Sequence, residues 1–307
     1  MQKNRFAGYF FALTAIFFWS FNIIIASMFA TSLMPLEIAF GRWFVATLIL
    51  IPLAWKDLNK NFQLLLQNWE LIVALAVTGI VIDNTLIYTA GHTASAIDIG
   101  LLDVTGPIFL VLLSRIFLKT PITRRQLLGL VVAVFGVVVI IVNGDFSSLA
   151  NFKPVPGDFW MLLNSFAFAV YSLLQYKRPP QVSQTSMLAA TALVGVLIIY
   201  PLLIWTTPEA QLQRFNMEDL AVVVYLGIFN SVLSYLCWNS ALASIGNIKT
   251  SIIYYLLPLF SGVEAYFILG EKMHPASLIG GILVIAGIAF VSLNGAKPQR
   301  AAKMPQK

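Results

Sequence analysis

The sequence predicts an all-α membrane protein with ten transmembrane helices, arranged as two inverted five-helix repeats. The 307-residue chain is 59% hydrophobic and only 10% charged, with a mean hydropathy of +0.85, whereas about a quarter of the residues of a soluble domain are charged. Apolar stretches long enough to cross a bilayer recur ten times along the chain. The second half also aligns with the first after a shift of 151 positions.

The ten apolar stretches are separated by short breaks that contain proline or charged residues. A helix of about 20 apolar residues spans a hydrocarbon core about 30 Å thick. The expected spans are 6–30, 36–55, 69–90, 95–118, 126–143, 157–176, 187–206, 219–242, 247–269 and 276–294. The first stretch follows Lys3 and Arg5, as a signal peptide would, but it exceeds the 7–15 residues of a signal core, so we expect a retained helix.

The internal repeat needs no gap between Thr93 and Gly144. The identities are Ile97, Pro107, Phe109, Leu118, Leu127, Gly129, Gly136, Asn143 and Gly144, which align with Ile248, Pro258, Phe260, Leu269, Leu278, Gly280, Gly287, Asn294 and Gly295. Duplicated hydrophobic units are common in membrane transporters, whose substrate site lies at the repeat interface near mid-membrane. We expect one repeat in residues 1–150, a second in 151–295, and a basic cytoplasmic tail in 296–307.

Basic residues predict how the chain is oriented. One set of alternate connections holds thirteen of them: Lys3, Arg5, Lys56, Lys60, Lys119, Arg124, Arg125, Lys177, Arg178, Lys297, Arg300, Lys303 and Lys307. The other set holds only Lys153, Arg214 and Lys272. The positive-inside rule then places both termini in the cytoplasm, in a multi-pass protein of the cell inner (plasma) membrane. Five spans per repeat is an odd number, so the two halves must cross the membrane in opposite senses.

Several short motifs resemble those of a known superfamily. They are Pro35-Leu36-Glu37 leading to Arg42, Ser95-Ala96 followed by Pro107, and Gly270-Glu271-Lys272 followed by Gly280 and Gly287. Over nearly the whole chain the sequence resembles the drug/metabolite transporter superfamily, in its ten-helix form built from two EamA-type repeats. The resemblance implies a central cavity between the halves and the export or exchange of small molecules. Similar proteins move amino acids, aromatic metabolites, cationic drugs, sugars or nucleotide-like compounds, and no motif selects one of these.

Asp103, near the middle of the fourth span, is the strongest candidate for a site residue. An acid at the centre of a membrane helix costs roughly 2.5–3.5 kcal/mol on insertion scales, so it should face a cavity, a partner or a ligand. We expect it to bind a cationic group or a proton, which makes proton coupling a candidate mechanism. A structural bond to a neighbouring helix is the alternative. Asp83 and Asn84 in the third span, with Tyr88 one turn further on, favour the same interpretation.

Two mid-span prolines are related by the repeat. Pro107 and Pro258 each remove a backbone hydrogen bond, to the carbonyls of Asp103 and Tyr254 respectively. Broken helices at corresponding positions of two repeats are typical of transporter binding sites, so we predict paired hinges. The alternative is a pair of ordinary kinks whose freed carbonyls are satisfied by neighbouring helices.

Aromatic residues inside the spans, close to polar neighbours, are predicted to line the cavity. Together with the acids and amides, the predicted substrate-binding set is Trp19, Asn22, Asp83, Asn84, Tyr88, Asp103, Tyr171, Tyr235, Trp238 and Tyr254. Aromatic faces bind flat or cationic ligands by stacking and cation–π attraction. Core packing is the competing explanation for each of these aromatic residues individually.

Three further charged residues lie in or near the spans. Glu37 follows Pro35 at the start of a helix, where an acid offsets the helix dipole, so we predict a capping role. Arg42 can extend its charge outward or pair with an acid or substrate. Glu264 is an acid within the ninth span for which a structural role and a functional role are equally supported.

The sequence also indicates what the chain does not do. The single Cys237 excludes an internal disulfide, and the two histidines offer no His-rich metal cluster, so no cofactor or metal is expected. Basic residues follow the cytoplasmic face, which argues against a nucleic-acid partner. We therefore expect a non-enzymatic secondary transporter, in the bilayer as a monomer or homodimer, that exports small amphipathic molecules. The alternatives are an importer or exchanger, a membrane enzyme, or a scaffold.

Overall fold

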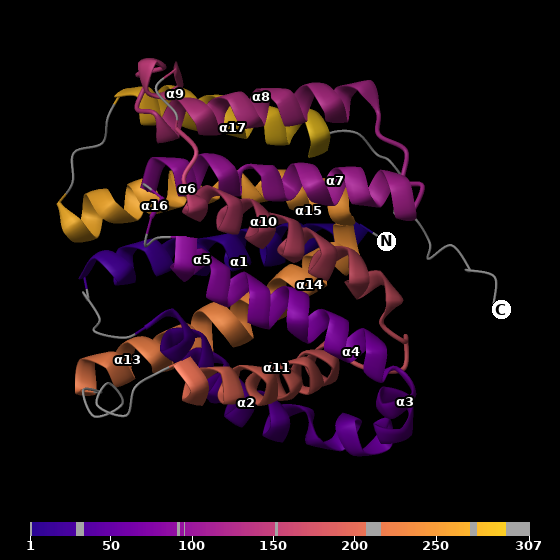
Figure 1. Cartoon of the computed structure of the whole chain (residues 1–307). Coiled ribbons are helices and arrows are strands. Elements are labelled where there is room, and N and C mark those ends of the chain that lie inside the picture. Colours follow the sequence, from indigo (N-terminus) through magenta and orange to yellow (C-terminus); the bar gives the residue numbers. More distant parts are fainter. Residues whose placement is uncertain are drawn as a thin grey trace.

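The computed structural model describes residues 2–28, 34–90, 93–94, 96–150, 153–206, 216–270 and 275–292, and every regular element in these ranges is a helix (Figure 1). Eight helical spans among them are long and apolar enough to cross a membrane. Two more apolar helices, Phe6–Phe21 and Pro275–Val291, are shorter over the side chains described. The predicted all-α, ten-helix membrane fold is therefore confirmed.

Each predicted span corresponds to one helix or to consecutive helical segments. In the first half these are α1 (Gln2–Met28), α2 (Pro35–Lys60), α4 (Trp69–Ala76), η1 (Val77–Ile82), α5 (Asp83–Ala90), α6 (Ala96–Asp103), α7 (Thr105–Phe117) and α8 (Arg124–Ile141). In the second they are α10 (Pro156–Leu174), α11 (Gln184–Thr206), α13 (Met217–Tyr225), η3 (Leu226–Leu233), α14 (Ser234–Ile245), α15 (Asn247–Tyr254), α16 (Leu257–Glu264), η4 (Ala265–Leu269) and α17 (Pro275–Ser292). Short connecting helices that the hydropathy pattern does not predict are α3 (Phe62–Gln67) and α9 (Ser147–Ala150). The 3-10 turn η2 (Gln175–Lys177) ends the predicted span 157–176.

Local sequence signals explain where two of these helices begin. Pro35 occupies the first turn of α2, and the Glu37 carboxylate accepts a 2.7 Å hydrogen bond from the Met34 backbone N–H. The predicted capping role of Glu37 is thus confirmed. At the start of α8, Thr123 and Gln126 form a reciprocal capping box, with hydrogen bonds of 2.9 and 3.2 Å.

The outer surface of the bundle is apolar, as expected of a protein surrounded by lipid. Its exposed side chains include Phe6, Leu48, Phe135, Leu197 and Ile282, which are between 52 and 81% exposed. Large exposed apolar side chains in such number are typical of a surface that contacts lipid. Buried polar side chains such as Arg42, Asn84 and Asn164 instead lie inside the bundle.

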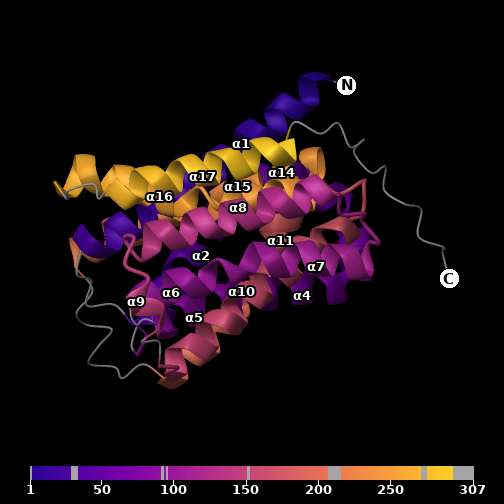
Figure 2. The same ribbon diagram turned by 90° about the horizontal axis from the view of Figure 1, so that it is seen from above.

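The α8–α17 pair shows how the two repeats are related. It lies on the opposite side of the bundle from the α2–α11 pair (Figure 1), and α17 runs alongside α8 in the perpendicular view (Figure 2). A methyl group added at Gly129 would lie 2.6 Å from the Gly287 carbonyl oxygen, and one added at Gly136 would lie 2.7 Å from that of Gly280. These glycines therefore permit close packing of α8 against α17.

The crosswise order of these contacts identifies the symmetry. Gly129 corresponds to Gly280 in the repeat but contacts Gly287, while Gly136 corresponds to Gly287 but contacts Gly280. Reciprocal contacts of this kind are the signature of a two-fold axis. The two helices are antiparallel, so the two-fold axis that relates them is perpendicular to both helices. Because the helices cross the membrane, this axis lies in the membrane plane. The two halves are thus inverted relative to each other.

Residues that correspond in the two repeats touch each other near this axis. The Asn84 side-chain amide lies 3.4 Å from the Tyr235 hydroxyl, and the Tyr254 hydroxyl lies 3.0 Å from an Asp103 carboxylate oxygen. The Tyr255 hydroxyl likewise donates a 3.1 Å hydrogen bond to the Val104 carbonyl. All three pairs are separated by 151 positions in the chain, which is the repeat shift itself.

The helices deviate from regular α geometry at repeat-related positions. The π segments η1 and η3 interrupt the third and eighth spans, and Val77–Ile82 corresponds to positions 228–233 within η3. Between α6 and α7 the helix breaks at Val104, and between α15 and α16 it breaks at Tyr255 and Leu256. π segments inside helices often occur at functional sites, and all four irregularities converge on the same central region.

Candidate functional site

A cavity lies between helices of both repeats at this central region. It is lined by residues of α5, α6, α7, α10, α14 and α15: Asp83, Asp103, Gly106, Pro107, Leu110, Asn164, Ser165, Phe168, Ala169, Trp238, Ser251 and Tyr254. The lining thus combines two acids, three small polar side chains and three large aromatic side chains. None of these described lining residues is basic.

Asp103 and Tyr254 form the part of the site nearest the helix breaks. Each is the last residue of its helix segment, Asp103 of α6 and Tyr254 of α15. The Tyr254 hydroxyl lies 3.0 and 3.2 Å from the two Asp103 carboxylate oxygens, so it can donate to either one. Both side chains are only partly buried, which leaves the carboxylate accessible from the cavity.

Asp83, like Asp103, is held by the phenol of a tyrosine from the second repeat. The Tyr235 hydroxyl lies 2.9 Å from an Asp83 carboxylate oxygen and 2.7 Å from the Gly79 carbonyl oxygen. A hydroxyl carries one proton, so it can donate fully to only one of these acceptors at a time. Asn84 donates to the Gly79 and Ile80 carbonyls at 3.2 and 3.1 Å, where the π segment departs from regular helical bonding.

Further polar groups surround Asp83 from neighbouring helices. The buried Asn164 side chain of α10 donates a hydrogen bond to the backbone carbonyl of Asp83. Arg42 of α2 is buried, donates a 2.8 Å hydrogen bond to Ser231, and lies within electrostatic reach of Asp83. Arg42 and the Tyr235 hydroxyl thus stabilise a negative charge on Asp83, while Asn164 holds its backbone, and the acid still faces the cavity.

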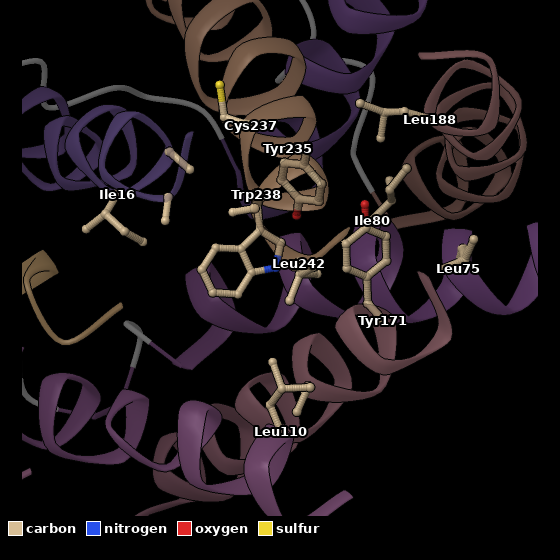
Figure 3. Packing of buried hydrophobic residues seen from close by; sticks show 14 of the residues in the cluster. Ile16, Leu75, Ile80, Leu110, Tyr171, Leu188, Tyr235, Cys237, Trp238 and Leu242 are labelled. Atoms are coloured by element: carbon tan, nitrogen blue, oxygen red, sulfur yellow. The ribbon is translucent and has the colours of Figure 1, made fainter. Parts of the chain in front are cut away.

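Aromatic rings from four helices pack together beside the cavity, and three of them line it: Phe168, Trp238 and Tyr254. The Trp19 ring centroid lies 5.4 Å from that of Trp238, 5.5 Å from those of Phe168 and Tyr235, and 6.4 Å from that of Tyr254. Figure 3 shows the rings of Tyr235 and Tyr171 side by side, and their centroids are 5.6 Å apart. The indole N–H groups of Trp19 and Trp238 donate 3.0 Å hydrogen bonds to the Asn230 carbonyl and the Ser172 hydroxyl. These bonds fix the orientation of both indole rings, of which Trp238 lines the cavity and Trp19 packs behind it.

Sequence comparison identifies the family. The profile of the EamA-like transporter family matches residues 6–142 and matches again over residues 155–293. The chain belongs to the EamA-like transporter family. Two successive matches, one in each half, agree with the crosswise packing of the two repeats.

Several curated relatives cover most of this EamA-like chain. An uncharacterized transporter of Archaeoglobus fulgidus is 28% identical over 90% of the chain and 94% of its own length. The uncharacterized transporter YyaM of Bacillus subtilis is 26% identical over 80% of each protein. A probable terminal-alkyne amino-acid exporter of Streptantibioticus cattleyicolor is 29% identical over 67% of each. The chain is therefore a multi-pass membrane transporter.

The fold also matches a solved crystal structure. That structure superimposes with a TM-score of 0.75, covering 95% of this chain and 97% of the other, at 17% sequence identity. Identity this low shows a shared fold alone.

The structure brings most of the predicted site residues of this EamA-like transporter together. Five of them line the cavity: Asp83, Asp103, Pro107, Trp238 and Tyr254. Others support its wall from behind: Trp19, Asn84, Tyr171 and Tyr235. Pro258 lies in the first turn of α16, directly after the break in the ninth span, and does not line the cavity. The side chains of Asn22 and Tyr88 lie outside the described residues.

Seven lining residues are absent from the predicted set: Gly106, Leu110 and Ala169, and four residues with polar or aromatic side chains. Asn164, Ser165 and Phe168 face the cavity from α10, and Ser251 faces it from α15. Asn164 and Ser165 are adjacent polar residues in the middle of a span, so the criterion that selected Asp103 would also have found them. Phe168 carries no such signal, because its sequence neighbours are apolar.

Proposed function

We propose that this EamA-like transporter exports small amphipathic molecules that carry a positively charged amino group, such as amino acids or aromatic amines. The observation that carries the proposal is the presence of two acids, Asp83 and Asp103, in one aromatic-walled cavity at the repeat interface. Amino acids contain such a group, and a similar exporter of Streptantibioticus cattleyicolor is named for an amino acid.

The chemistry of the cavity favours an organic cation. A buried carboxylate gains most from a cation that takes the place of lost water. The faces of Phe168, Trp238 and Tyr254 attract the same cation through the ring quadrupole and also pack against an apolar body. Asn164, Ser165 and Ser251 supply hydrogen-bonding groups for polar parts of the ligand.

The repeat-related breaks support an alternating-access mechanism. Breaks next to Asp103 and Tyr254 allow the half-helices α6 and α15 to move relative to α7 and α16. We propose that Pro107 and Pro258 act as hinges at these breaks. An inverted repeat gives the chain two related conformations, one open to each side. The alternating basic connections support a cytoplasmic location for both termini, in the cell inner membrane.

A flux experiment tests the proposal. Purified protein in proteoliposomes is screened with labelled phenylalanine, tyramine and tetraphenylphosphonium. We expect uptake or efflux of at least one amine-bearing compound, and its loss in Asp103→Asn, which keeps the side-chain shape and removes the charge. The matched control is Asp145→Asn, because Asp145 is fully exposed in the connection after α8. Equal flux in wild type and Asp103→Asn would refute the assigned site.

An importer or exchanger remains the alternative, since the symmetry of the fold does not set direction. Loading the compound on one side of vesicles with a known protein orientation distinguishes these outcomes. Net movement toward the side carrying the termini would contradict export.

A further inference from the structure

We infer that Glu264 is a proton-binding site separate from the central cavity, and that its proton links the contact between α1 and α16 to the transport cycle. The inference rests on the proposed transport function for its consequence, and on the geometry around Glu264 for the site itself. Glu264 is the last residue of α16, beyond the break at Tyr255 and Leu256. It is 6% exposed and does not line the cavity.

The hydrogen bonds around Ser20 indicate which form of Glu264 the packing suits. The Ser20 hydroxyl oxygen lies 2.6 Å from a Glu264 carboxyl oxygen and 2.7 Å from the Phe17 carbonyl oxygen. A serine hydroxyl has a single proton to donate, and a carbonyl cannot donate at all. One proton shared between two acceptors gives two weak bonds. Both short contacts are full-strength hydrogen bonds at once only if Glu264 is protonated and donates to Ser20, while Ser20 donates to Phe17.

The second carboxyl oxygen supports the same protonation state. Glu264 Oε2 is buried and has no hydrogen-bond partner in the described part of the chain. A carboxylate with one unbonded oxygen and no cation would carry a large desolvation cost, whereas a neutral acid leaves only one weakly polar atom unpaired. Ser20, the partner of the other oxygen, is fully buried as well.

The charged groups on the surrounding helices do not offset a negative charge at Glu264. The elements packed against α16 are α1, α8, α17 and η4. Among their described side chains, the titratable groups are Tyr9 on α1, Arg124 and Arg125 in the first turn of α8, and Tyr266 on η4. Tyr225 of α13 is within electrostatic reach of Glu264. Both arginines and Tyr266 are exposed, and Tyr9 lies about 16 Å along α1 from Ser20 at 1.5 Å per residue.

The position of Ser20 connects this site to the cavity. Its neighbour Trp19 packs against Trp238 at 5.4 Å and Tyr254 at 6.4 Å, ring centroid to centroid. The Glu264–Ser20 hydrogen bond therefore connects the part of α1 that supports the cavity wall to α16, the half-helix beyond the break at Tyr255 and Leu256. When Glu264 gives its proton to water, Ser20 must redirect its only proton from Phe17 to the carboxylate. The buried charge then favours a conformation in which water reaches α16.

The repeat does not duplicate this arrangement. A shift of 151 positions relates Glu264 to Leu113 and Ser20 to Tyr171. The first half therefore has no acid at the corresponding position. The site can thus bind and release one proton in each transport cycle.

Infrared spectroscopy tests the site without any substrate. In reconstituted protein at neutral pH, we expect a C=O band of a protonated carboxyl that Glu264→Gln removes. The glutamine amide can still donate to Ser20, so this variant should fold. The matched control is Glu218→Gln, an exposed acid at the start of α13, which should leave the band unchanged. The same band in wild type and Glu264→Gln would overturn the inference.

A second variant keeps the test decisive if Glu264→Gln does not fold. Ser20→Ala leaves the acid in place and removes the acceptor of its proton, so the C=O band should move to higher frequency. A band that does not move would mean that Glu264 is not protonated against Ser20, and would overturn the inference.

The consequence for transport is measured with whichever of phenylalanine, tyramine and tetraphenylphosphonium the wild-type protein moves. We expect Glu264→Gln to exchange labelled for unlabelled compound but to lose the accumulation driven by a pH gradient. Full gradient-driven accumulation in this variant would refute the coupling. If wild-type protein moves none of the three compounds, the proposed function fails, and the infrared result still decides the protonation site.

Discussion

Tyr254→Phe isolates the contribution of one hydroxyl to the site. The substitution keeps the ring that packs on Trp19 and Trp238 and removes the only hydrogen bond recorded between the Asp103 carboxylate and another described side chain, at 3.0–3.2 Å. Hydrogen bonds to charged groups contribute about 1.5–3 kcal/mol. If that stabilisation supports Asp103 while it holds a cation, affinity should fall by roughly 10- to 150-fold.

The matched control is Tyr255→Phe, on the adjacent residue of the same turn. Its hydroxyl donates to the Val104 backbone carbonyl at 3.1 Å, so its loss should cost about 0.5–1.5 kcal/mol of stability and leave charge selectivity alone. The assay is the concentration dependence of tyramine flux, compared with the thermal stability of each purified variant. Unchanged tyramine affinity in Tyr254→Phe, or an equal loss in Tyr255→Phe, would refute the role given to the Asp103–Tyr254 pair.

Three further predictions concern the moving helices, the repeat contact and the topology. Pro107→Ala and Pro258→Ala should slow flux without lowering the yield of folded protein, because a restored backbone hydrogen bond stiffens each break. Wild-type flux in the double variant would show that the prolines only pack and do not act as hinges. Gly136→Val should destabilise the protein by about 1–3 kcal/mol, because the larger side chain overpacks the contact between α8 and α17. Thermal denaturation measures this loss, and an unchanged melting temperature would contradict the close contact. Reporter fusions at 56–68 should report the cytoplasm and fusions at 145–155 the outside; a cytoplasmic signal at 145–155 would contradict the predicted orientation.

The fold was readable from the sequence because lipid imposes a simple rule. Each span must be apolar over about 20 residues and must satisfy its own backbone, so hydropathy alone located all ten spans. Hydropathy marks only the apolar part of a helix, which is why α2 continues to Lys60 beyond the predicted end at 55. Hydropathy does not predict the connecting helix α3, because the bilayer does not determine its length or composition.

The site could be predicted only in part. Asp103 and Asp83 were found because charge inside a membrane needs a reason, and Tyr254 was found through the repeat. The shift of 151 positions states that Asp103 and Tyr254 are equivalent, but equivalence does not place two residues in contact. Two equivalent residues touch each other only if they lie close to the two-fold axis. The position of that axis depends on how the helices pack, which the sequence pattern does not give. The π segments likewise have no signature in the pattern of apolar residues.

The contacts between equivalent residues also bear on how such a chain can arise. In a dimer of identical five-helix units, each on-axis residue would face its own copy, so an acid at position 103 would face an acid and a phenol would face a phenol. Two carboxylates at that distance would repel each other. Joining the units into one chain allows each partner to change independently, and Asp103 now faces Tyr254 while Asn84 faces Tyr235. Within a single chain the symmetric contact thus becomes one between a donor and an acceptor. The inward-open and outward-open forms then need not be equal in energy.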